Sequence, residues 1–438
     1  MTRVEQIDRT EGEKAVKPSP PWRAALTGVA ALVVVAFLVV RVLAGNPEVA
    51  GPPPLTLTPG EQIASLEQRV QAQPENFAAW QELGAALVQE AIQSGNPVVY
   101  TRAEGVLLEG ATLAPNHPAI LISQGVLALA RHEFGKAAEL AATVRAADPF
   151  NADALVVLID AQVELGQYEE AAASLQQLLD LRPALPALAR TSYLRELNGD
   201  LPGAEQALIQ AITAGSRSGY DLAVTHSLLG DLYLKQGELD RAEERYSQAE
   251  EFFAGLGAVT LGRARIALAQ GELASAVESL ATLTERLPTP ENLTLLGETL
   301  IAASRVAEAE DAFATVEVVE ELQLDAGIVV DLELARYEAD HGDPARALSL
   351  AEAAYAERPT VFAAGVMGWS LYRIGETEAA LPYAEESLRL GTLDAELRLW
   401  AAEIFAASGN DLAAEEQRQI AAGLDPWVAV VKTFAAAE

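Results

Sequence analysis

The sequence predicts an all-α protein: a solenoid of about ten helix pairs, preceded by one transmembrane helix. Three observations lead to this prediction. Residues 24–44 form an almost uninterrupted apolar stretch, and small residues then recur at a fixed spacing through the rest of the chain. Between them, apolar residues follow helical spacing, without strand-like alternation. We therefore expect one domain built of repeats, although a chain of 438 residues would otherwise suggest several separate domains.

The first predicted element is a transmembrane helix over residues 24–44. Its 21 residues would span about 31 Å, enough to cross the hydrocarbon core of a bilayer. Basic residues gather before it, in residues 1–23, and after Arg41 none follows until Arg69. The distribution of positive charge therefore places residues 1–23 in the cytoplasm and the rest of the chain outside it.

An alternative for the same stretch is a cleaved signal peptide, since Val42-Leu43-Ala44 could serve as a cleavage site. The long polar segment before the stretch, the length of the apolar run and Arg41 favour an uncleaved anchor. A lipoprotein is excluded, because Asn46 stands where a cysteine would be needed. Residues 45–60 are rich in Pro and Gly and form a predicted linker, which leaves 61–438 as a repeat domain outside the cytoplasm.

The repeat is defined by three registers that stay in phase. The first is an alanine at intervals of 33, 34 or 38 residues: Ala137, Ala171, Ala204, Ala242, Ala276, Ala309, Ala347, Ala380 and Ala414. Five residues before most of these alanines is a glycine (Gly166, Gly199, Gly237, Gly271, Gly342, Gly375, Gly409), and twelve after several is a proline (Pro149, Pro183, Pro288, Pro359, Pro426). An alanine permits two antiparallel helices to approach closely, a glycine turns the chain between them, and a proline stops the second helix.

This pattern resembles the tetratricopeptide repeat (TPR), and residues 223–254 match it best, with Leu229-Gly230, Tyr233, Gly237, Ala242 and Tyr246. The resemblance covers about residues 61–430 and implies a right-handed superhelix. Ser304 replaces the turn glycine of one unit. The two 38-residue intervals predict longer connections at residues 214–221 and near 316–325, and the first unit holds about seven extra residues around 91–97. We expect a short helix over 61–73 to cap the first unit and the segment around Trp427 to cap the last.

The resemblance also implies a binding surface, because the first helix of each TPR unit lines a concave groove. The candidate partner-binding residues at these positions are Tyr193, Arg265, Arg336, Phe362, Trp369 and Tyr372. The same positions hold the acidic residues Asp153, Asp160, Asp231, Glu291 and Glu298. The aromatic stripe of Phe362, Trp369 and Tyr372 has two interpretations: packing against the neighbouring unit, or a hot spot for a bound peptide.

Composition excludes several classes of function. The net charge of −33 disfavours binding to nucleic acid, and the absence of cysteine excludes disulfides and thiolate metal sites. Four scattered histidines offer no metal site, and a turn or cap role is expected for His341. The sequence contains none of the common hydrolase, metalloprotease or nucleotide-binding motifs. We therefore expect no catalytic residues, no cofactor, no metal and no small-molecule substrate.

The predicted function is a membrane-anchored protein–protein interaction scaffold of a bacterial cell envelope, with proteins or peptides as partners. An alternative is a substrate-holding maturation factor, because residues 63–87 are similar to the repeat part of c-type cytochrome biogenesis proteins. Residues 1–45 carry 6 basic and 4 acidic residues, so the acidity lies entirely in the repeat domain. That domain is expected to prefer neutral or basic partners.

Overall fold

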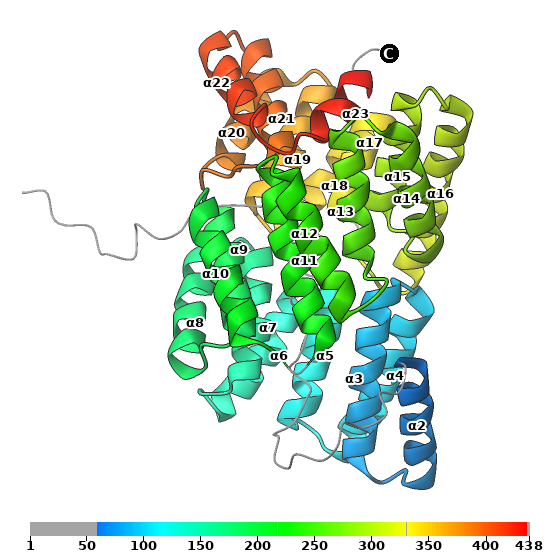
Figure 1. Ribbon diagram of the computed structural model, residues 1–438. Helices are drawn as coiled ribbons and strands as arrows, with labels where there is room; N and C mark the ends of the chain where they lie inside the picture. Colours follow the sequence, from blue (N-terminus) through cyan, green and yellow to red (C-terminus); the bar gives the residue numbers. More distant parts are fainter. Residues whose placement is uncertain (1–58, 217, 330, 436–438) are drawn as a thin grey trace, which may run out of the picture.

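The computed structural model describes residues 59–216, 218–329 and 331–435, and this part of the chain consists of 22 α-helices without a strand (Figure 1). The predicted cytoplasmic tail, the predicted transmembrane helix over 24–44 and nearly all of the predicted linker lie outside the described residues. Among the helices that are described, none is both long and apolar enough to cross a bilayer.

Twenty of these helices form ten antiparallel pairs, as the sequence predicts, with α2 before them and α23 after them. The first five pairs are α3 (Phe77–Ser94) with α4 (Pro97–Leu113), α5 (Pro118–Ala130) with α6 (Phe134–Ala147), α7 (Ala152–Glu164) with α8 (Tyr168–Leu181), α9 (Leu185–Leu197) with α10 (Leu201–Ala214), and α11 (Gly219–Lys235) with α12 (Leu239–Phe252). The other five are α13 (Gly257–Ala269) with α14 (Leu273–Arg286), α15 (Pro290–Ala302) with α16 (Val306–Asp325), α17 (Asp331–His341) with α18 (Pro344–Glu357), α19 (Val361–Arg373) with α20 (Thr377–Ser387), and α21 (Ala395–Ala407) with α22 (Asp411–Ala421). The flanking helices are α2 (Pro59–Ala72), which packs on α3, and α23 (Val428–Ala435).

The alanine and proline registers have the predicted roles. All nine register alanines are at most 1% exposed, so each lies where the two helices of its pair meet. Four of the prolines stand two residues beyond the last residue of a second helix, as Pro149 does after α6. Several first helices begin at a side-chain cap, for example Asn151, whose side chain accepts a hydrogen bond from the amide of Ala154. Local sequence thus sets where most helices begin and end.

The turn register is also confirmed at most positions. Gly166, Gly199, Gly237, Gly271, Gly375 and Gly409 all have positive φ, as a left-handed turn between two helices requires. Ser304, which replaces the glycine of its unit, has a φ of 60° and so adopts the same conformation at a steric cost. Gly342 is not among the glycines with positive φ, so the turn after α17 is built differently.

The irregular intervals do not form longer connections, and that prediction is wrong. The extra residues lengthen helices instead: α3 has 18 residues, α11 has 17 and α16 has 20, whereas most helices have 13 or 14. Residues 316–325 are the C-terminal half of α16, and residues 91–94 belong to α3. Both segments are rich in good helix formers, so the helices continue where the family spacing would end them.

The pairs wind into a superhelix whose successive turns stack on one another (Figure 1). The hydroxyl of Tyr168 in the third pair accepts a hydrogen bond from the amide of Val361 in the ninth, 3.1 Å away. The Thr392 hydroxyl, at the start of the tenth pair, donates to the carbonyl of Leu197 in the fourth, at 3.2 Å. One superhelical turn therefore takes about six pairs.

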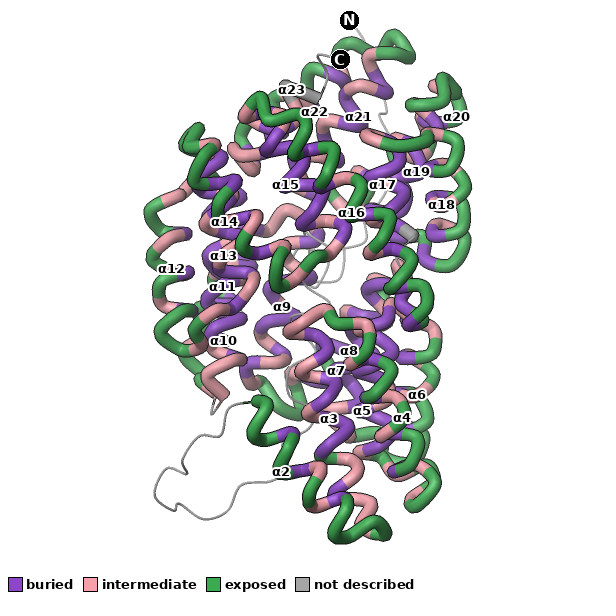
Figure 2. The backbone as a smooth tube through the Cα atoms, turned by 90° about the vertical axis from the view of Figure 1, so that its right-hand side faces the viewer, coloured by how far each residue is buried: buried purple, intermediate pink, exposed green. Residues whose placement is uncertain are grey.

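The first helix of each pair is the more deeply buried one. α15 and α19 are buried along most of their length, whereas α12 and α18 each bury only three residues, and Figure 2 shows this contrast between inner and outer helices. The first helices thus face the interior of the superhelix, where the sequence predicts the binding surface.

Candidate functional site

A cavity of about 170 Å³ lies inside the superhelix, between the first helices of its C-terminal half and the segment that leads into α23. We call this cavity, together with the polar side chains beside it on α15, α17, α19 and α21, the C-terminal groove. Three of the six predicted residues line the cavity directly: Arg265, Arg336 and Phe362. Its other charged lining residues are Glu196, Asp231, Lys235, Glu291, Asp394, Glu396 and Asp425.

The two predicted arginines are paired with acidic residues of other helices. A guanidinium nitrogen of Arg265 on α13 lies 3.4 Å from a carboxylate oxygen of Glu291 on α15. The same guanidinium lies over the ring of Trp427, 4.8 Å from its centroid. Arg336 on α17 forms a 2.9 Å ion pair with Glu396 on α21. Arg265 therefore links two neighbouring pairs, and Arg336 links the eighth pair to the tenth.

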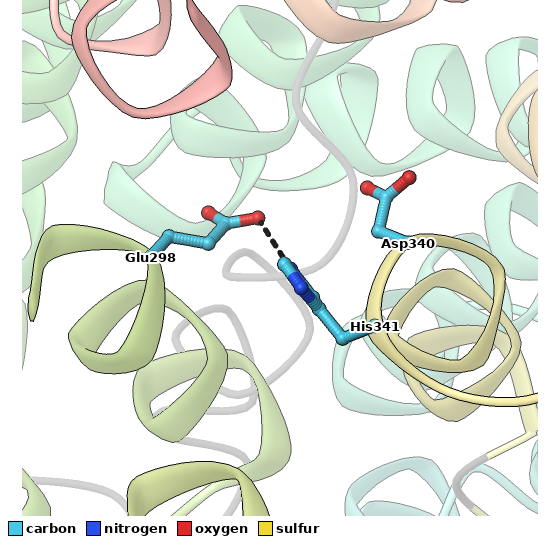
Figure 3. A group of neighbouring side chains, drawn as sticks. All are labelled: Glu298, Asp340 and His341. Carbon is cyan, nitrogen blue, oxygen red and sulfur yellow. Dashed lines mark hydrogen bonds and ion pairs between the residues drawn. The ribbon is translucent and has the colours of Figure 1, made fainter. Parts of the chain in front are cut away.

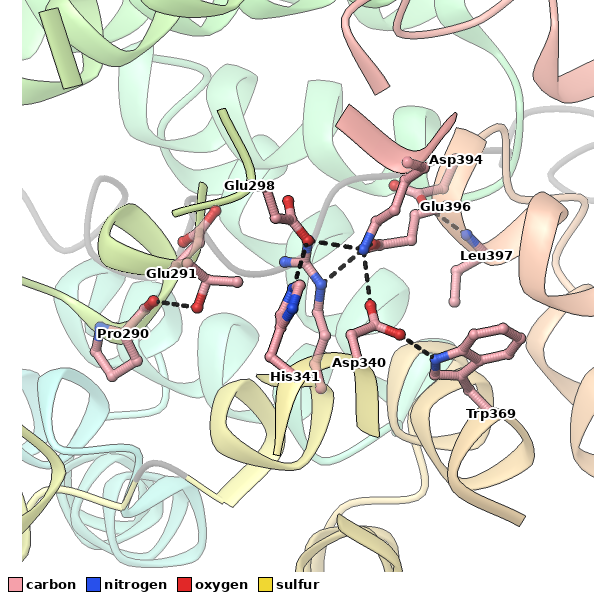
Figure 4. Close-up of polar contacts among 12 residues, drawn as sticks. Pro290, Glu291, Glu298, Asp340, His341, Trp369, Asp394, Glu396 and Leu397 are labelled. Carbon is pink, nitrogen blue, oxygen red and sulfur yellow. Dashed lines mark hydrogen bonds and ion pairs between the residues drawn. The ribbon is translucent and has the colours of Figure 1, made fainter. Parts of the chain in front are cut away.

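Lys432 of α23 is the centre of the charge cluster in the groove. Its ammonium lies 3.0 Å from Glu298, 2.7 Å from Asp340 and 3.1 Å from Glu396, so three carboxylates from three different pairs surround one cation (Figure 4). The side chains of Glu298 and Asp340 are 2% and 10% exposed. At this burial the attraction between opposite charges is screened far less than at the surface.

Asp340 and His341 extend the cluster along the end of α17. Asp340 also accepts a 2.8 Å hydrogen bond from the indole of Trp369 and lies 3.1 Å from Arg373, both on α19. Nε2 of His341 lies 3.2 Å from a carboxylate oxygen of Glu298 (Figure 3). Because a carboxylate only accepts hydrogen bonds, this nitrogen carries the proton. The expectation of a turn or cap role for His341 is therefore wrong: its side chain points into the groove.

The cluster changes the protonation of its members. Burial alone would raise the pKa of Glu298, but Lys432, the hydrogen bond from His341 and Arg336 hold that pKa below its ordinary value. Lys432 and the indole of Trp369 likewise lower the pKa of Asp340 against the effect of burial. Burial raises the pKa of Glu396 in spite of Arg336 and Lys432. The pKa of Lys432 is raised, because its three carboxylates outweigh burial. At neutral pH the Lys432 ammonium and the Glu298 and Asp340 carboxylates are all charged.

The predicted aromatic residues lie at different depths. Tyr193 and Phe362 are 6% and 9% exposed and belong to the largest apolar core, where both line a very small second cavity. Trp369 is partly buried and stacks between Tyr372 of its own helix and Trp400 of α21, with ring centroids 5.2 Å and 5.8 Å away. The aromatic stripe therefore packs against the next pair, which was the first of its two interpretations. That these residues also bind a partner stays a prediction.

A metal ion would find one suitable set of ligands among the described residues. Single ligand atoms of Glu298, Asp340 and His341 lie within 4.8 Å of one another. The ammonium of Lys432 is bonded to both carboxylates of this set, and a metal would have to replace it. In this structure the positive charge beside these ligand atoms is the ammonium of Lys432.

Sequence reasoning missed Asp340, His341, Trp427 and Lys432 as members of the groove. Asp340 and His341 close the first helix of their unit, beyond the family positions used for the prediction. Lys432 carried a usable signal, since it is one of only five lysines in the chain and interrupts the apolar run Val428–Val431. Two of the five, Lys235 and Lys432, line the groove or its cluster.

A larger cavity of about 330 Å³ lies where the two turns of the superhelix meet, between residues of α3, α4, α11, α14, α16 and α17. Its walls are mostly apolar and include Tyr100, Tyr220 and Leu287. None of the six predicted residues lines it. Its lining also includes Arg286, Glu291 and Glu333, but not the side chains that surround Lys432.

Comparison with known proteins supports the repeat assignment. The model of the tetratricopeptide repeat matches residues 122–186, 157–220, 227–289, 261–318 and 366–426, which together make up more than half of the chain. No curated protein sequence matches the chain.

Among solved structures, the chain is similar to a human IFIT1 dimer with m7Gppp-AAAA, at 15% identity and a TM-score of 0.45, over 84% of this chain and 96% of that one. It is also similar to a tetratricopeptide repeat protein from Parabacteroides merdae, at 19% identity and a TM-score of 0.38, over 61% and 100% of the two chains. A third is the APC/C hetero-tetramer Cut9-Hcn1, at 13% identity and a TM-score of 0.36, over 86% and 93%.

Proposed function

The chain belongs to the tetratricopeptide repeat family, and on this basis we propose that it is a protein–protein interaction scaffold that binds polypeptide segments in its C-terminal groove. The scaffold is not an enzyme in this proposal. The observation that supports it most directly is the Lys432 ammonium held by Glu298, Asp340 and Glu396. Inward-facing helices of three repeat pairs converge there on one side chain of a peptide segment, the arrangement that a peptide-binding groove needs.

The polarity of the groove supports a partner with positive charge. The repeat domain is strongly acidic, and the groove gathers eight carboxylates with only Arg265, Arg336, Arg373, Lys235 and Lys432 as cations among its described side chains. A basic or neutral segment would be attracted to this surface, and an acidic one repelled.

The proposal places the scaffold at the cytoplasmic membrane of a bacterium, with residues 24–44 as a single-pass anchor and the repeat domain outside the cytoplasm. The sequence supports this location through the 21-residue apolar stretch and the basic residues that precede it. Proteins of the envelope are then the partners, and the scaffold assists their assembly or stability.

Site-specific photocrosslinking tests the binding function. A photoreactive amino acid at Tyr372, next to the cluster, is expected to yield a defined set of covalent polypeptide adducts in intact cells. The same amino acid at Val318, an exposed position on the outer helix α16, is the matched control and should yield none of them. Adducts at Val318 alone would place the binding surface on the outside and contradict the proposal. Haem-binding polypeptides among the adducts would favour the maturation alternative.

Protease added to spheroplasts tests the location. We expect digestion of the repeat domain from outside and loss of membrane association when residues 24–44 are deleted. A repeat domain that is protected from the protease would reverse the topology. A mature chain that begins near Gly45 would replace the anchor with a cleaved leader.

A further inference from the structure

The last described helix of the chain occupies the C-terminal groove. Residues Val428 and Val431 of α23 are 4% and 1% exposed, and Val431 belongs to an apolar core that it shares with α13, α14, α15 and α16. Trp427, just before the helix, packs in the same core and carries the Arg265 guanidinium over its ring. Leu424 and Val428 pack on Ala395 of α21, as expected of a segment that caps the last pair, and the helix continues across to α15.

The stacking of successive superhelical turns positions this segment at the groove. The amide of Asp425 donates a 2.8 Å hydrogen bond to the carbonyl of Lys235, at the end of α11 in the fifth pair. This contact repeats the stacking of Thr392 on Leu197 one pair earlier. A regular eleventh pair would start here and follow the superhelix. Instead, α23 turns inward and closes the end of the interior (Figure 1).

The groove needs a cation at the position of Lys432. Without it, the described ionic partners of Glu298, Asp340 and Glu396 would be Arg336, Arg373 and His341, with the Trp369 indole as a neutral donor to Asp340. Buried carboxylates without sufficient counter-charge are costly, so an empty groove is a poor state for this protein. Apolar residues flank the lysine at helical spacing, so that Trp427, Val428, Val431 and Lys432 fall on one face.

We propose that the C-terminal groove is a receptor for a helical polypeptide segment that presents one lysine beside an apolar, aromatic-containing face, and that α23 is its intramolecular occupant, which such a partner displaces. This inference rests on the proposed function and specifies its partner. A helix of eight residues is not stable alone, so α23 folds only while docked. In this proposal it leaves the groove while the repeats stay folded. Because α23 is tethered, its effective concentration is on the order of millimolar, and a partner must bind well or be locally abundant to replace it.

The absence of cysteine from the chain provides a direct test. Val431→Cys places a single thiol on the buried face of α23, and Ala429→Cys places it on the exposed face of the same helix as the matched control. In the full chain, we expect a maleimide to react with the thiol at 431 at least about 10-fold more slowly than with the thiol at 429, since undocking by about 1.4 kcal/mol or more must come first.

The probe is a synthetic peptide with the sequence of residues 424–438, added at millimolar concentration. It should accelerate labelling at position 431 several-fold and leave position 429 unchanged. The same peptide with glutamate in place of its lysine should have no effect, and Lys432→Glu in the chain should accelerate labelling at 431 without any peptide. Val428→Cys gives a second buried reporter if Val431→Cys disturbs the fold.

Four outcomes would overturn the inference. Equal labelling of the two thiols would show that α23 is not docked, and an unchanged rate with excess peptide would show a permanent structural element. If the labelling rate at position 431 rose with protein concentration and light scattering gave a doubled mass, the occupant would be a second copy of the chain. Acceleration by Mn²⁺ alone would identify a metal site at Glu298, Asp340 and His341. None of these four outcomes determines the photocrosslinking result at Tyr372. The proposed function is therefore tested independently of this inference.

Discussion

The ammonium of Lys432 lies 2.7 Å from Oδ2 of Asp340, although 92 positions separate the two residues in the sequence. This ion pair joins the end of the described chain to a helix three pairs earlier, so it depends on the curvature of the whole C-terminal half of the superhelix. Asp340 makes the contact while it also holds the indole of Trp369 and the guanidinium of Arg373. One buried carboxylate thus couples α17, α19 and α23.

Asp340→Asn tests the importance of this carboxylate. The substitution keeps the size of the side chain and an acceptor for Trp369, but removes the charge that faces Lys432 and Arg373. Because those cations would lose a buried partner, we expect the free energy of unfolding at pH 7 to fall by about 2 kcal/mol or more. Urea denaturation followed by circular dichroism measures this change.

Glu352→Gln is the matched control for Asp340→Asn, since it also neutralises one acid but at an exposed position of α18. Its effect should stay within about 0.5 kcal/mol. Equal effects of the two substitutions would mean that the cluster adds no more than a surface charge does.

The buried ion pair of Arg190 and Asp160 gives a second prediction. Nε of Arg190 lies 2.7 Å from Asp160, and the two side chains are 2% and 5% exposed. Asp160→Asn leaves the arginine charge buried without its counter-ion and is expected to cost about 3–5 kcal/mol of unfolding free energy. Replacing both residues, Asp160→Leu with Arg190→Met, should recover most of that loss. A double variant as unstable as the single one would show that the pair provides more than mutual neutralisation.

The fold was largely predictable because its determinants are local and repeated. Ala242 and Ala276 are fully buried where the two helices of a pair touch, and each unit repeats this requirement. Pro288 and the turn glycine Gly271 mark where a helix must end, and they act through their own backbone. Arg265, Arg336 and Phe362 were found in the groove for the same reason, because a fixed position in each unit faces inward.

The remaining features depend on contacts that no single unit contains. Helix propensity and the family spacing predict different ends for α16, and its length of 20 residues follows the propensity. The place of Lys432 depends on the stacking of Asp425 on Lys235, which requires a complete superhelical turn. Glu298 and His341 meet only because α15 and α17 are neighbours in space. Such juxtapositions cannot be derived from the periodicity of one chain.

Glu164 leads to a prediction on pH. Burial raises the pKa of its carboxyl from 4.5 to about 8, while Arg358 lowers it and Glu333 raises it further. A carboxyl whose pKa is higher in the folded than in the unfolded state keeps its proton on folding between these two values. Its contribution to stability is therefore complete below about pH 4.5 and is lost as the pH rises towards 8.

Glu164→Gln should accordingly stabilise the protein at pH 8 relative to the wild type, by a few kcal/mol at most, and much less at pH 5. Urea denaturation at both pH values measures the difference. Burial also raises the pKa of Glu196 to about 7, so only the comparison with the wild type isolates Glu164. Glu169→Gln, at an exposed position of α8, is the control and should show no such dependence. A wild-type advantage at pH 8 would contradict a protonated Glu164.

Close packing around Tyr246 gives a fourth prediction. The ring of Tyr246 fits between Gly230 of α11 and Gly262 of α13, and its hydroxyl donates a 2.6 Å hydrogen bond to Asp231. A methyl group at Gly262 would lie 2.2 Å from the ring, so the ring would have to move. We expect Gly262→Ala to lower the melting temperature, with a loss of about 1–3 kcal/mol.

Gly105→Ala is the matched control for Gly262→Ala, because it adds the same methyl group to a helix with nothing within 4 Å. It should stabilise α4 by about 0.5–1 kcal/mol. If both substitutions shifted the melting temperature upward, the tight contact with Tyr246 would be refuted.

Ser304 provides the last prediction, on the turn between α15 and α16. Its φ of 60° matches the turn glycines Gly237 and Gly271, whose φ values are 74° and 76°. A side chain in this conformation costs roughly 1–2 kcal/mol, whereas glycine adopts it freely but loses more entropy on folding. Ser304→Gly is therefore expected to raise the free energy of unfolding by about 0.5–1 kcal/mol. Ser304→Ala keeps a Cβ and should bring no gain, and Gly271→Ala should cost at least about 1 kcal/mol. Thermal denaturation of the three variants measures these shifts, and a glycine variant no more stable than the alanine variant would show that the turn bears no strain.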